Sequence, residues 1–297
     1  MKKINNMTTA TVTQTSNGWT NGLIGVLLFS GSMPATKVAV LSLDPVFVTL
    51  VRALIAALLA ALFLCYNKVS IPTKVESKSL ILVSIGAVIG FPLLSSLALQ
   101  HMTAARSLVF VGTLPLSTAI FAVLRGKEKP KPLFWLFALL GSALVVGFAY
   151  AQHATSSLTG DLLMLAAIIL CGLAYAEGAV LTKNMGGSQV ISWAIIYALP
   201  LLIPAIFFFI PSNLHHLQTD TWVSLLYLGT MSMFTGFIFW YKGLAQGGIA
   251  TVGQLQLLQP FFGLALAAFF LKEHISLGML AVTLGVVGCV AASKKFA

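Results

Sequence analysis

Charged residues are scarce in this sequence. Only 8% of its 297 residues are Asp, Glu, Lys or Arg, whereas 58% are hydrophobic. A soluble domain usually contains about 25% charged and about 45–50% apolar residues, so a soluble fold of this composition could not cover its surface with polar groups. The scarcity of charge excludes an ordinary soluble protein and predicts that lipid surrounds much of the chain.

Cysteine is also rare, and no residues are grouped as in catalytic or metal sites. Three cysteines lie within apolar runs: Cys65, Cys171 and Cys289. Their odd number and spacing predict buried free thiols rather than a disulfide framework or a metal site. The adjacent His215 and His216 beside Asp220 are too few to indicate a metal. We expect no catalytic residues, no metal and no cofactor.

Residues 1–21 are polar and rich in Thr and Asn. We expect them to form a flexible cytoplasmic tail, with no cleavable signal peptide. The net charge of +10 does not indicate nucleic-acid binding, because the basic residues form short clusters between apolar runs. We therefore expect no nucleic-acid partner.

Long apolar runs dominate the rest of the sequence. A bilayer core of about 30 Å requires about 20 apolar residues per helix, and backbone groups in lipid must be hydrogen-bonded internally. Runs such as 54–64 do not alternate in polarity as barrel strands would. We predict an all-α integral membrane protein of about ten transmembrane helices, at residues 22–42, 46–66, 79–100, 104–124, 133–151, 161–182, 190–210, 222–243, 250–271 and 276–293.

The basic residues predict the orientation of these helices. If the N-terminus lies in the cytoplasm, thirteen of the 17 Lys and Arg residues fall on the cytoplasmic side, as the positive-inside rule requires. Only Lys37, Arg52, Arg106 and Lys272 fall toward the outside. We therefore predict that the N-terminus and the C-terminus are both cytoplasmic.

The two halves of the chain share a pattern. An offset of 145 residues places Pro115 on Pro260 and Glu128 on Glu273, with an apolar stretch of equal length in each half. Five helices in each half would force the second copy into the membrane with the opposite topology. Inverted repeats of this kind recur in secondary transporters, whose substrate sites lie near the membrane midplane between the halves.

Three runs of sequence carry a more specific signal. The run LLFSGSMPATKVAVLSLDPVFVTLVRALIAALLAAL holds Gly31, Lys37, Pro45 and Arg52 in order. The runs ALQHMTAARSLVFVGTLPLSTAIFAVLRGKE and LLQPFFGLALAAFFLKEHISLGMLAVTLGVVGCVAA each hold a proline followed by a glutamate. Together these features resemble the drug/metabolite transporter superfamily, in particular its ten-helix EamA-type exporters, over nearly the whole chain.

The resemblance implies two EamA-like repeats, residues 22–151 with helices 1–5 and residues 152–297 with helices 6–10. It also implies a protein of the bacterial inner membrane that exports amino acids or related amphipathic metabolites by alternating access. The pathway would be shaped mainly by helices 1, 3, 4, 6, 8 and 9. The partners would be a small-molecule substrate and the lipid bilayer, and the transporter would be a monomer or a homodimer.

Glu177 is an acid inside predicted helix 6. An ionisable side chain at the bilayer centre costs about 2.5–3.5 kcal/mol to insert, so it should face a partner or a wet cavity. We interpret Glu177 as a candidate proton-coupling site, which would favour proton antiport; a structural hydrogen bond is the alternative. Lys37 lies at nearly the corresponding place in helix 1, where it would hold an anionic substrate group or extend to the outer interface.

Arg52 and Arg106 join Lys37 in the predicted outer leaflet. If the three converge, they would form a cationic vestibule suited to carboxylates, which arginine can bind through two parallel hydrogen bonds. Asp44 and Glu273 lie on the same predicted side and could instead neutralise them.

Predicted helix 9 is unusually polar. At 100° per residue, Gln256 and Gln259 lie about 60° apart, while Gln254 points nearly opposite. Gln256 and Gln259 would line the pathway or form hydrogen bonds between helices. Tyr175 and Trp240 would add an aromatic wall to the pathway or anchor the membrane interface.

Prolines inside the predicted helices are candidate kinks, because proline removes a backbone hydrogen bond. The positions that we expect to support rocking of the helices are Pro34, Pro92, Pro115 and Pro260.

Three alternatives to metabolite export lie within transport: an importer, an uncoupled facilitator or exchanger, and a multidrug efflux protein. Outside transport, the chain could be a membrane-embedded enzyme or a structural partner protein. An enzyme would group acids and histidines at one membrane face, and a docking protein would carry a sizeable soluble loop. The sequence shows neither feature, so we predict a transporter.

Overall fold

The computed structural model describes residues 16–102, 107, 110–151, 157–211, 217–263, 265 and 277–296. Within these ranges the regular structure is helical throughout. The elements of the first half are α1 (Ser16–Ser30), α2 (Ser32–Ser42), α3 (Pro45–Tyr66), α4 (Lys74–Val83), the π-helix η1 (Ser84–Gly90), α5 (Phe91–His101), α7 (Leu114–Leu124) and α8 (Pro132–Ala151). Those of the second half are α9 (Leu158–Met185), α10 (Gly187–Phe209), α11 (Thr219–Tyr227), the π-helix η3 (Leu228–Thr235), α12 (Gly236–Gly247), α13 (Ile249–Gly253), the 3-10 helix η4 (Gln254–Leu258) and α15 (Leu277–Phe296).

Several of these helices have the length and composition of membrane spans. In the described part of the chain, the long apolar helical segments are Asn17–Ser42, Pro45–Tyr66, Lys74–His101, Leu158–Met185, Gly187–Phe209 and Thr219–Gly247. Two shorter apolar helices are Leu114–Leu124 and Pro132–Gly147. Each of the ten predicted segments contains helix, and the number that crosses the bilayer stays a prediction.

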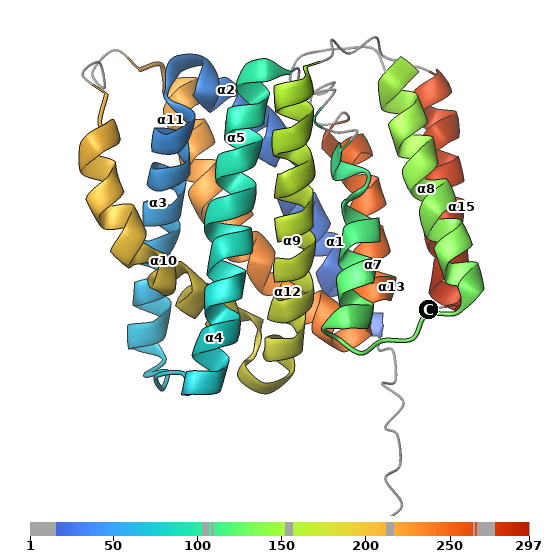
Figure 1. The fold of residues 1–297 in the computed structure, drawn as a ribbon, viewed down its shortest axis with the longest axis horizontal. Helices are drawn as coiled ribbons and strands as arrows, with labels where there is room; N and C mark the ends of the chain where they lie inside the picture. The colour runs from blue at the N-terminus through green and yellow to red at the C-terminus, as the bar shows by residue number, and fades with distance from the viewer. Residues whose placement is uncertain are drawn as a thin grey trace, which may run out of the picture.

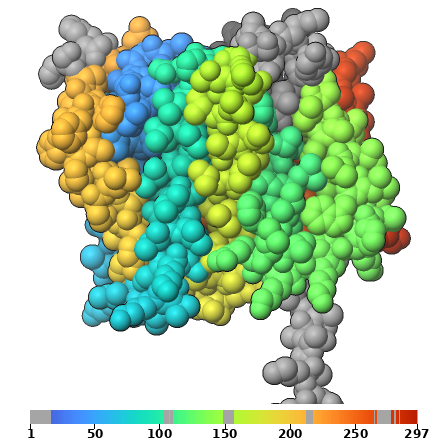
Figure 2. Space-filling view, in the orientation of Figure 1, coloured from blue at the N-terminus to red at the C-terminus, as the bar shows by residue number. Residues whose placement is uncertain are grey.

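The outer surface of the bundle is apolar. Figure 2 shows one face, on which α10, α4 with α5, α9, α7 and α8 follow one another from left to right. On the helices around the bundle, large apolar side chains such as Leu62, Leu139 and Phe208 are exposed by 55–84%. Exposed apolar surface on this scale marks contact with lipid or protein rather than water. The described cysteines are free, but Cys65 is exposed on α3, so the prediction of a buried thiol is wrong there and holds for Cys171.

Helices at corresponding places in the two halves run in opposite directions (Figure 1). α3 runs from the upper end of the bundle to the lower end, and α10, packed beside it, runs upward. α8 and α15 form a second antiparallel pair, in which the Lys131 N–H donates a 3.0 Å hydrogen bond to the Phe296 carbonyl. These directions support the proposed inverted arrangement of the halves.

The two π-helices also lie at corresponding places. Adding the sequence offset of 145 residues to η1 (Ser84–Gly90) gives 229–235, which falls within η3 (Leu228–Thr235). π-helical turns are rare and occur often at functional sites. Their repetition at the same offset as the proline–glutamate pattern supports the proposal that the halves are copies of one unit.

The first span is broken at Gly31, between α1 and α2. A Cβ atom on Gly31 would lie 2.6 Å from the Tyr227 Oη, so the absence of a side chain lets this tyrosine approach. Tyr227 donates a 2.7 Å hydrogen bond to the carbonyl of Leu28, just before the break. An interrupted helix tolerates exposed backbone carbonyls only where protein or a wet cavity can hydrogen-bond them.

α1 begins at Ser16, so the predicted flexible tail, residues 1–21, is wrong over its last six residues. Composition alone indicates coil here, but α1 packs along α12. The Asn21 side chain donates a 2.9 Å hydrogen bond to the Gln246 side chain, and this tertiary contact stabilises a polar helix start. The remainder of the predicted tail, 1–15, lies outside the described residues.

Basic residues gather at the lower end of the bundle in Figure 1. The connection between α3 and α4, the connection between α7 and α8, and the C-terminal end of α15 all lie at this end. The described basic residues of these segments are Lys68, Arg125, Lys127, Lys129, Lys131, Lys294 and Lys295. This distribution supports a cytoplasmic placement of the lower end, which we retain as a proposal.

Candidate functional site

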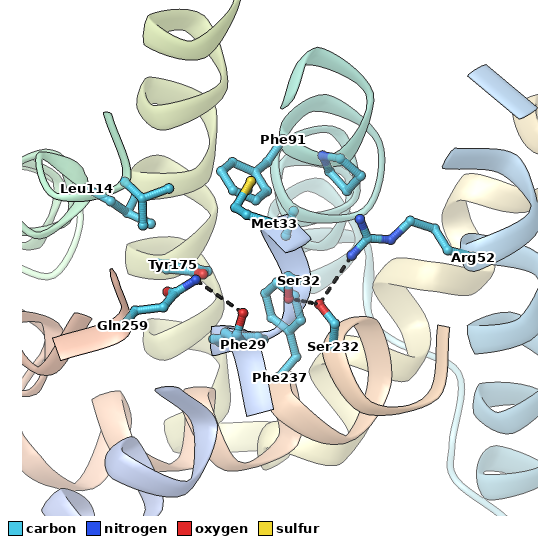
Figure 3. Close-up of a pocket in the computed structure, with 13 residues that line it drawn as sticks. Phe29, Ser32, Met33, Arg52, Phe91, Leu114, Tyr175, Ser232, Phe237 and Gln259 are labelled. Atoms are coloured by element: carbon cyan, nitrogen blue, oxygen red, sulfur yellow. Dashed lines mark hydrogen bonds between the residues drawn. The ribbon is translucent and has the colours of Figure 1, made fainter. Parts of the chain in front are cut away.

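A small cavity lies between the two halves (Figure 3). Its volume is about 20 Å³, room for about one ordered water molecule. The described residues that line it are Phe29, Ser32, Met33, Arg52, Ala87, Phe91, Pro92, Val111, Leu114, Tyr175, Ser232, Phe237 and Gln259. Because the cavity is so narrow, a metabolite could enter only if the surrounding helices moved apart.

One side of the cavity is polar and carries a positive charge. Arg52, the eighth residue of α3, reaches toward Ser232 (Figure 3) and donates a 3.2 Å hydrogen bond from Nη2 to the Ser232 Oγ. That hydroxyl lies 2.7 Å from the Ser32 Oγ. The Arg52 side chain is buried, and its Nε has no hydrogen-bond partner in the described structure.

The irregular helical segments place these groups. Ser32 is the first residue after the break at Gly31, and Ser232 lies inside η3. Phe91 and Pro92 follow directly after η1, where the wider π turn precedes a residue that lacks a backbone N–H donor. The broken and widened turns of both halves therefore face one cavity.

The opposite side of the cavity is bounded by an amide. The Gln259 side chain donates a 3.2 Å hydrogen bond from Nε2 to the Phe29 carbonyl, close to the break in the first span. Gln256, one helical turn earlier, donates a 3.3 Å hydrogen bond to the Tyr175 hydroxyl. Both glutamines thus connect the second half of the chain to the lining of the cavity.

Four aromatic rings, which we call the aromatic cluster, close one end of the cavity: Phe29, Tyr175, Phe237 and Trp240. Phe29 contacts Phe237 edge-on at 5.1 Å between ring centroids, and Tyr175 contacts Trp240 at 5.4 Å. Trp240 lies one turn after Phe237, toward the lower end of α12. All four rings are buried, so the cluster packs tightly beside the cavity.

An ion pair lies beyond the aromatic cluster. The Arg125 Nε donates a 2.6 Å hydrogen bond to the Glu177 carboxylate, with the arginine side chain 44% exposed and the glutamate 6% exposed. This hydrogen bond raises the pKa of the Arg125 guanidinium above its usual value, so the arginine remains a cation. The pair balances the charge of Glu177 without a bound proton.

Glu128 forms a second contact between the halves at this end. Its two carboxylate oxygens accept hydrogen bonds of 2.7 and 2.8 Å from the backbone N–H groups of Ile249 and Ala250, at the start of α13. A negative charge is favoured at a helix N-terminus, where backbone N–H groups lack helical partners. Gly248, which precedes α13, has a φ of 91°, a backbone conformation that favours glycine.

The sequence model of the EamA-like transporter family matches residues 17–149 and, a second time, residues 158–293. The chain belongs to the EamA-like transporter family. This family is part of the drug/metabolite transporter superfamily, so the resemblance noted in the sequence is confirmed. The chain is a multi-pass membrane transporter and not an enzyme.

Relatives of this EamA-like transporter carry the same general description. An uncharacterized transporter of Bacillus subtilis, YdeK, is 54% identical over 284 residues, which are 96% of this chain and 99% of that protein. YoaV of Bacillus subtilis, also an uncharacterized transporter, is 25% identical over 87% of this chain and 90% of that protein. A crystal structure with 18% sequence identity superposes with a TM-score of 0.79 over 95% of this chain and 99% of its own, which shows a shared fold.

The structure of this transporter separates the predicted pathway residues into groups. Arg52, Tyr175 and Gln259 line the cavity. Trp240 and Gln256 are not among the described lining residues, but both contact Tyr175, which is. Since Tyr175 and Trp240 are at most 4% exposed, the alternative that they anchor the membrane interface is wrong.

The other predicted residues lie elsewhere. Lys37 donates a 2.8 Å hydrogen bond from Nζ to the Leu99 carbonyl, near the end of α5, where a cation is favoured by unpaired helix carbonyls. Glu177 pairs with Arg125 and does not line the cavity. Arg106 lies outside the described residues. Of the three cations of the predicted vestibule, Arg52 is the one that lines the cavity in the described structure.

The predicted kink prolines of the transporter all lie close to changes in helix geometry. Pro34 is the third residue of α2, just after the break at Gly31, and Pro92 follows η1. Pro115 is the second residue of α7, and Pro260 comes two residues after η4. Their part in rocking of the helices remains a proposal.

Sequence reasoning missed several lining residues of the transporter. Ser32 and Ser232 are small hydroxyl residues within apolar runs, a pattern that also occurs in ordinary helix packing. Phe29 and Phe237 belong to a chain with twenty phenylalanines, so composition did not distinguish them. The one available signal was the position of Ser32 beside Gly31, where a break in the helix would place it next to free backbone groups.

Proposed function

We propose that this protein is a secondary transporter that exports small amphipathic metabolites, amino acids among them, across the bacterial inner membrane by alternating access. The observation that carries the proposal is the cavity between the two halves. Arg52 and two serines occupy one side of it, the Gln259 amide bounds the opposite side, and aromatic and aliphatic side chains complete the lining, a composition suited to an amphipathic solute.

Alternating access is supported by the way the lower end of the cavity is closed. The aromatic cluster packs beside the cavity, and the contacts of Glu128 and Glu177 join the two halves nearer the lower end. A carrier needs such contacts to break and re-form as its halves rock around a fixed central site. The interrupted first span and the two π-helices supply places where helices can bend.

Proton antiport through Glu177 is the least supported part of the sequence-based prediction. Arg125 already neutralises the carboxylate at 2.6 Å, and Glu177 lies apart from the cavity lining. We therefore propose a structural role for this ion pair, at the end of the bundle where α9 and the connection after α7 meet.

The proposal is tested with purified protein in liposomes. Counterflow of radiolabelled amphipathic solutes, measured with and without an imposed pH gradient, should show saturable exchange. Uptake should then be greater into inside-out vesicles than into right-side-out vesicles, because an exporter moves its substrate away from the cytoplasmic face. Exchange of no solute in a broad panel of amino acids, organic acids and cationic dyes would contradict a transport role for the cavity, and inward flux alone would favour the importer alternative.

A further inference from the structure

Arg52 is a buried cation whose charge no described residue balances. It is 4% exposed, it donates a single described hydrogen bond to the neutral Ser232 hydroxyl, and its Nε has no partner. Guanidinium is always protonated in proteins, and a buried charge without a counter-charge is strongly destabilising. The site therefore favours an anion from outside the chain.

The groups around the guanidinium complete a site for an anion of particular shape. Ser32 and Ser232 are linked hydroxyls that can turn their hydrogen atoms toward an acceptor. The Nε–H of Arg52 lies beside its Nη groups in one plane, a fork that matches the two oxygens of a carboxylate. A planar carboxylate thus finds two donors from Arg52 and a third from a serine.

The remainder of the lining indicates what the carboxylate should be attached to. Phe29, Phe91, Tyr175 and Phe237 surround the cavity beside Met33, and these side chains favour an apolar, flat or branched group. None of the described lining residues is acidic, so a substrate ammonium group would find no counter-charge there. A monoanion fits this lining better than a zwitterion.

We propose that Arg52 binds the carboxylate of an organic monoanion with an aromatic or branched aliphatic tail, and that such acids rather than zwitterionic amino acids are the substrates. This inference rests on the proposed transport function and narrows its substrate class from amphipathic metabolites in general to organic monoanions, which leaves out the zwitterionic amino acids. The tail lies against the aromatic cluster, and entry of the acid requires the cavity to widen beyond its present 20 Å³.

The first test uses the wild-type protein and matched ligands. Benzoate, phenylacetate and 4-methylpentanoate are compared with their amides and with L-phenylalanine, by isothermal titration of the detergent-purified protein. Each acid should bind at least about tenfold more tightly than its amide, since a hydrogen bond to a charged group contributes that much or more. Equal affinity of acid and amide, or tighter binding of L-phenylalanine than of the acids, would overturn the inference.

Variants of Arg52 provide the second test. R52Q should lose about tenfold or more in affinity for benzoate while its affinity for benzamide changes little. R52K should lose less, because it keeps the charge and loses the planar fork. K183Q, which removes an exposed cation outside the cavity lining, is the matched control and should bind as the wild type does. Unchanged benzoate binding in R52Q would contradict a role for Arg52.

Flux separates failure of this inference from failure of the transport proposal. If benzoate shows counterflow in liposomes, and the R52Q variant reduces it while the K183Q variant does not, both the carboxylate site and the transport proposal are supported. Counterflow of benzamide or L-phenylalanine that is insensitive to R52Q would overturn the carboxylate site and leave a transporter. If R52Q does not fold, the comparison of acid with amide in the wild type, together with the binding of benzoate to R52K, still decides whether Arg52 forms a carboxylate site.

Discussion

The carboxylate of Glu128 accepts a 2.7 Å hydrogen bond from the backbone N–H of Ile249. Glu128 lies in the connection between α7 and α8, whereas Ile249 begins α13 in the other half of the chain. A contact of this kind, with Ala250 as a second donor, ties the halves together at the lower end of the bundle.

Glu128→Gln should weaken this tie and open the lower end. The amide keeps one acceptor oxygen and loses the charge, and hydrogen bonds to charged groups contribute about 1.5–3 kcal/mol. In a cysteine-free background, a cysteine at Ala87 in the cavity lining should then react roughly tenfold faster with a thiol reagent applied from the cytoplasmic side.

Glu76→Gln is the control for that experiment. Glu76 also caps a helix, through Thr73 at the start of α4, but it is partly exposed and its described hydrogen bonds are all with Thr73, in the first half. Labelling at Ala87 should therefore be unchanged in this variant. Equal labelling in both variants would show that Glu128 does not hold the lower end closed.

Gly31→Ala should destabilise the protein. The new Cβ would lie 2.6 Å from the Tyr227 Oη and 2.9 Å from its Cζ, and overpacking of this kind typically costs about 1–3 kcal/mol. We expect a lower midpoint of thermal unfolding in detergent. Gly288→Ala is the matched control, because among the described residues no atom outside the neighbouring backbone of its own helix lies within 4 Å of a Cβ at Gly288; an equal loss in both variants would count against the packing argument.

Glu177→Gln should transport with the same pH dependence as the wild type. Arg125 balances the carboxylate in the folded protein, so the transport cycle gains no titrating group from Glu177. Because Arg125 is 44% exposed, the lost ion pair should reduce stability by roughly 1 kcal/mol or less. A displaced pH optimum for counterflow in the variant would restore Glu177 as a proton-coupling residue.

Reporter fusions should place the chain near Lys127 and the chain near Lys272 on opposite sides of the membrane. The two positions correspond at the offset of 145 residues, and an odd number of helices in each half reverses the second copy. Alkaline phosphatase, active outside, should be inactive after Lys127 and active after Lys272, and green fluorescent protein should show the reverse. The same activity at both positions would rule out inverted repeats.

The sequence predicted the chemistry of single residues better than their contacts. Arg52, Tyr175 and Gln259 were each selected for a polar or aromatic side chain inside an apolar run, and all three line the cavity. Lys37 and Glu177 were selected on the same ground, yet each has a partner elsewhere: Leu99 for the lysine and Arg125 for the glutamate. An unusual side chain in lipid must find a partner, but sequence does not say which one.

The sequence alone determined the class of this protein. Its apolar runs, its scarcity of charge and the repeated pattern around Pro115 and Pro260 can all be read from the order of the residues, without knowledge of any contact between helices. The free energy of placing a segment in lipid depends on those residues alone. Only the tertiary structure decided that Arg52 would have no counter-charge among the described residues while Glu177 would have one. Those outcomes depend on how each helix is rotated and where its turns break or widen, and contacts between distant segments fix both.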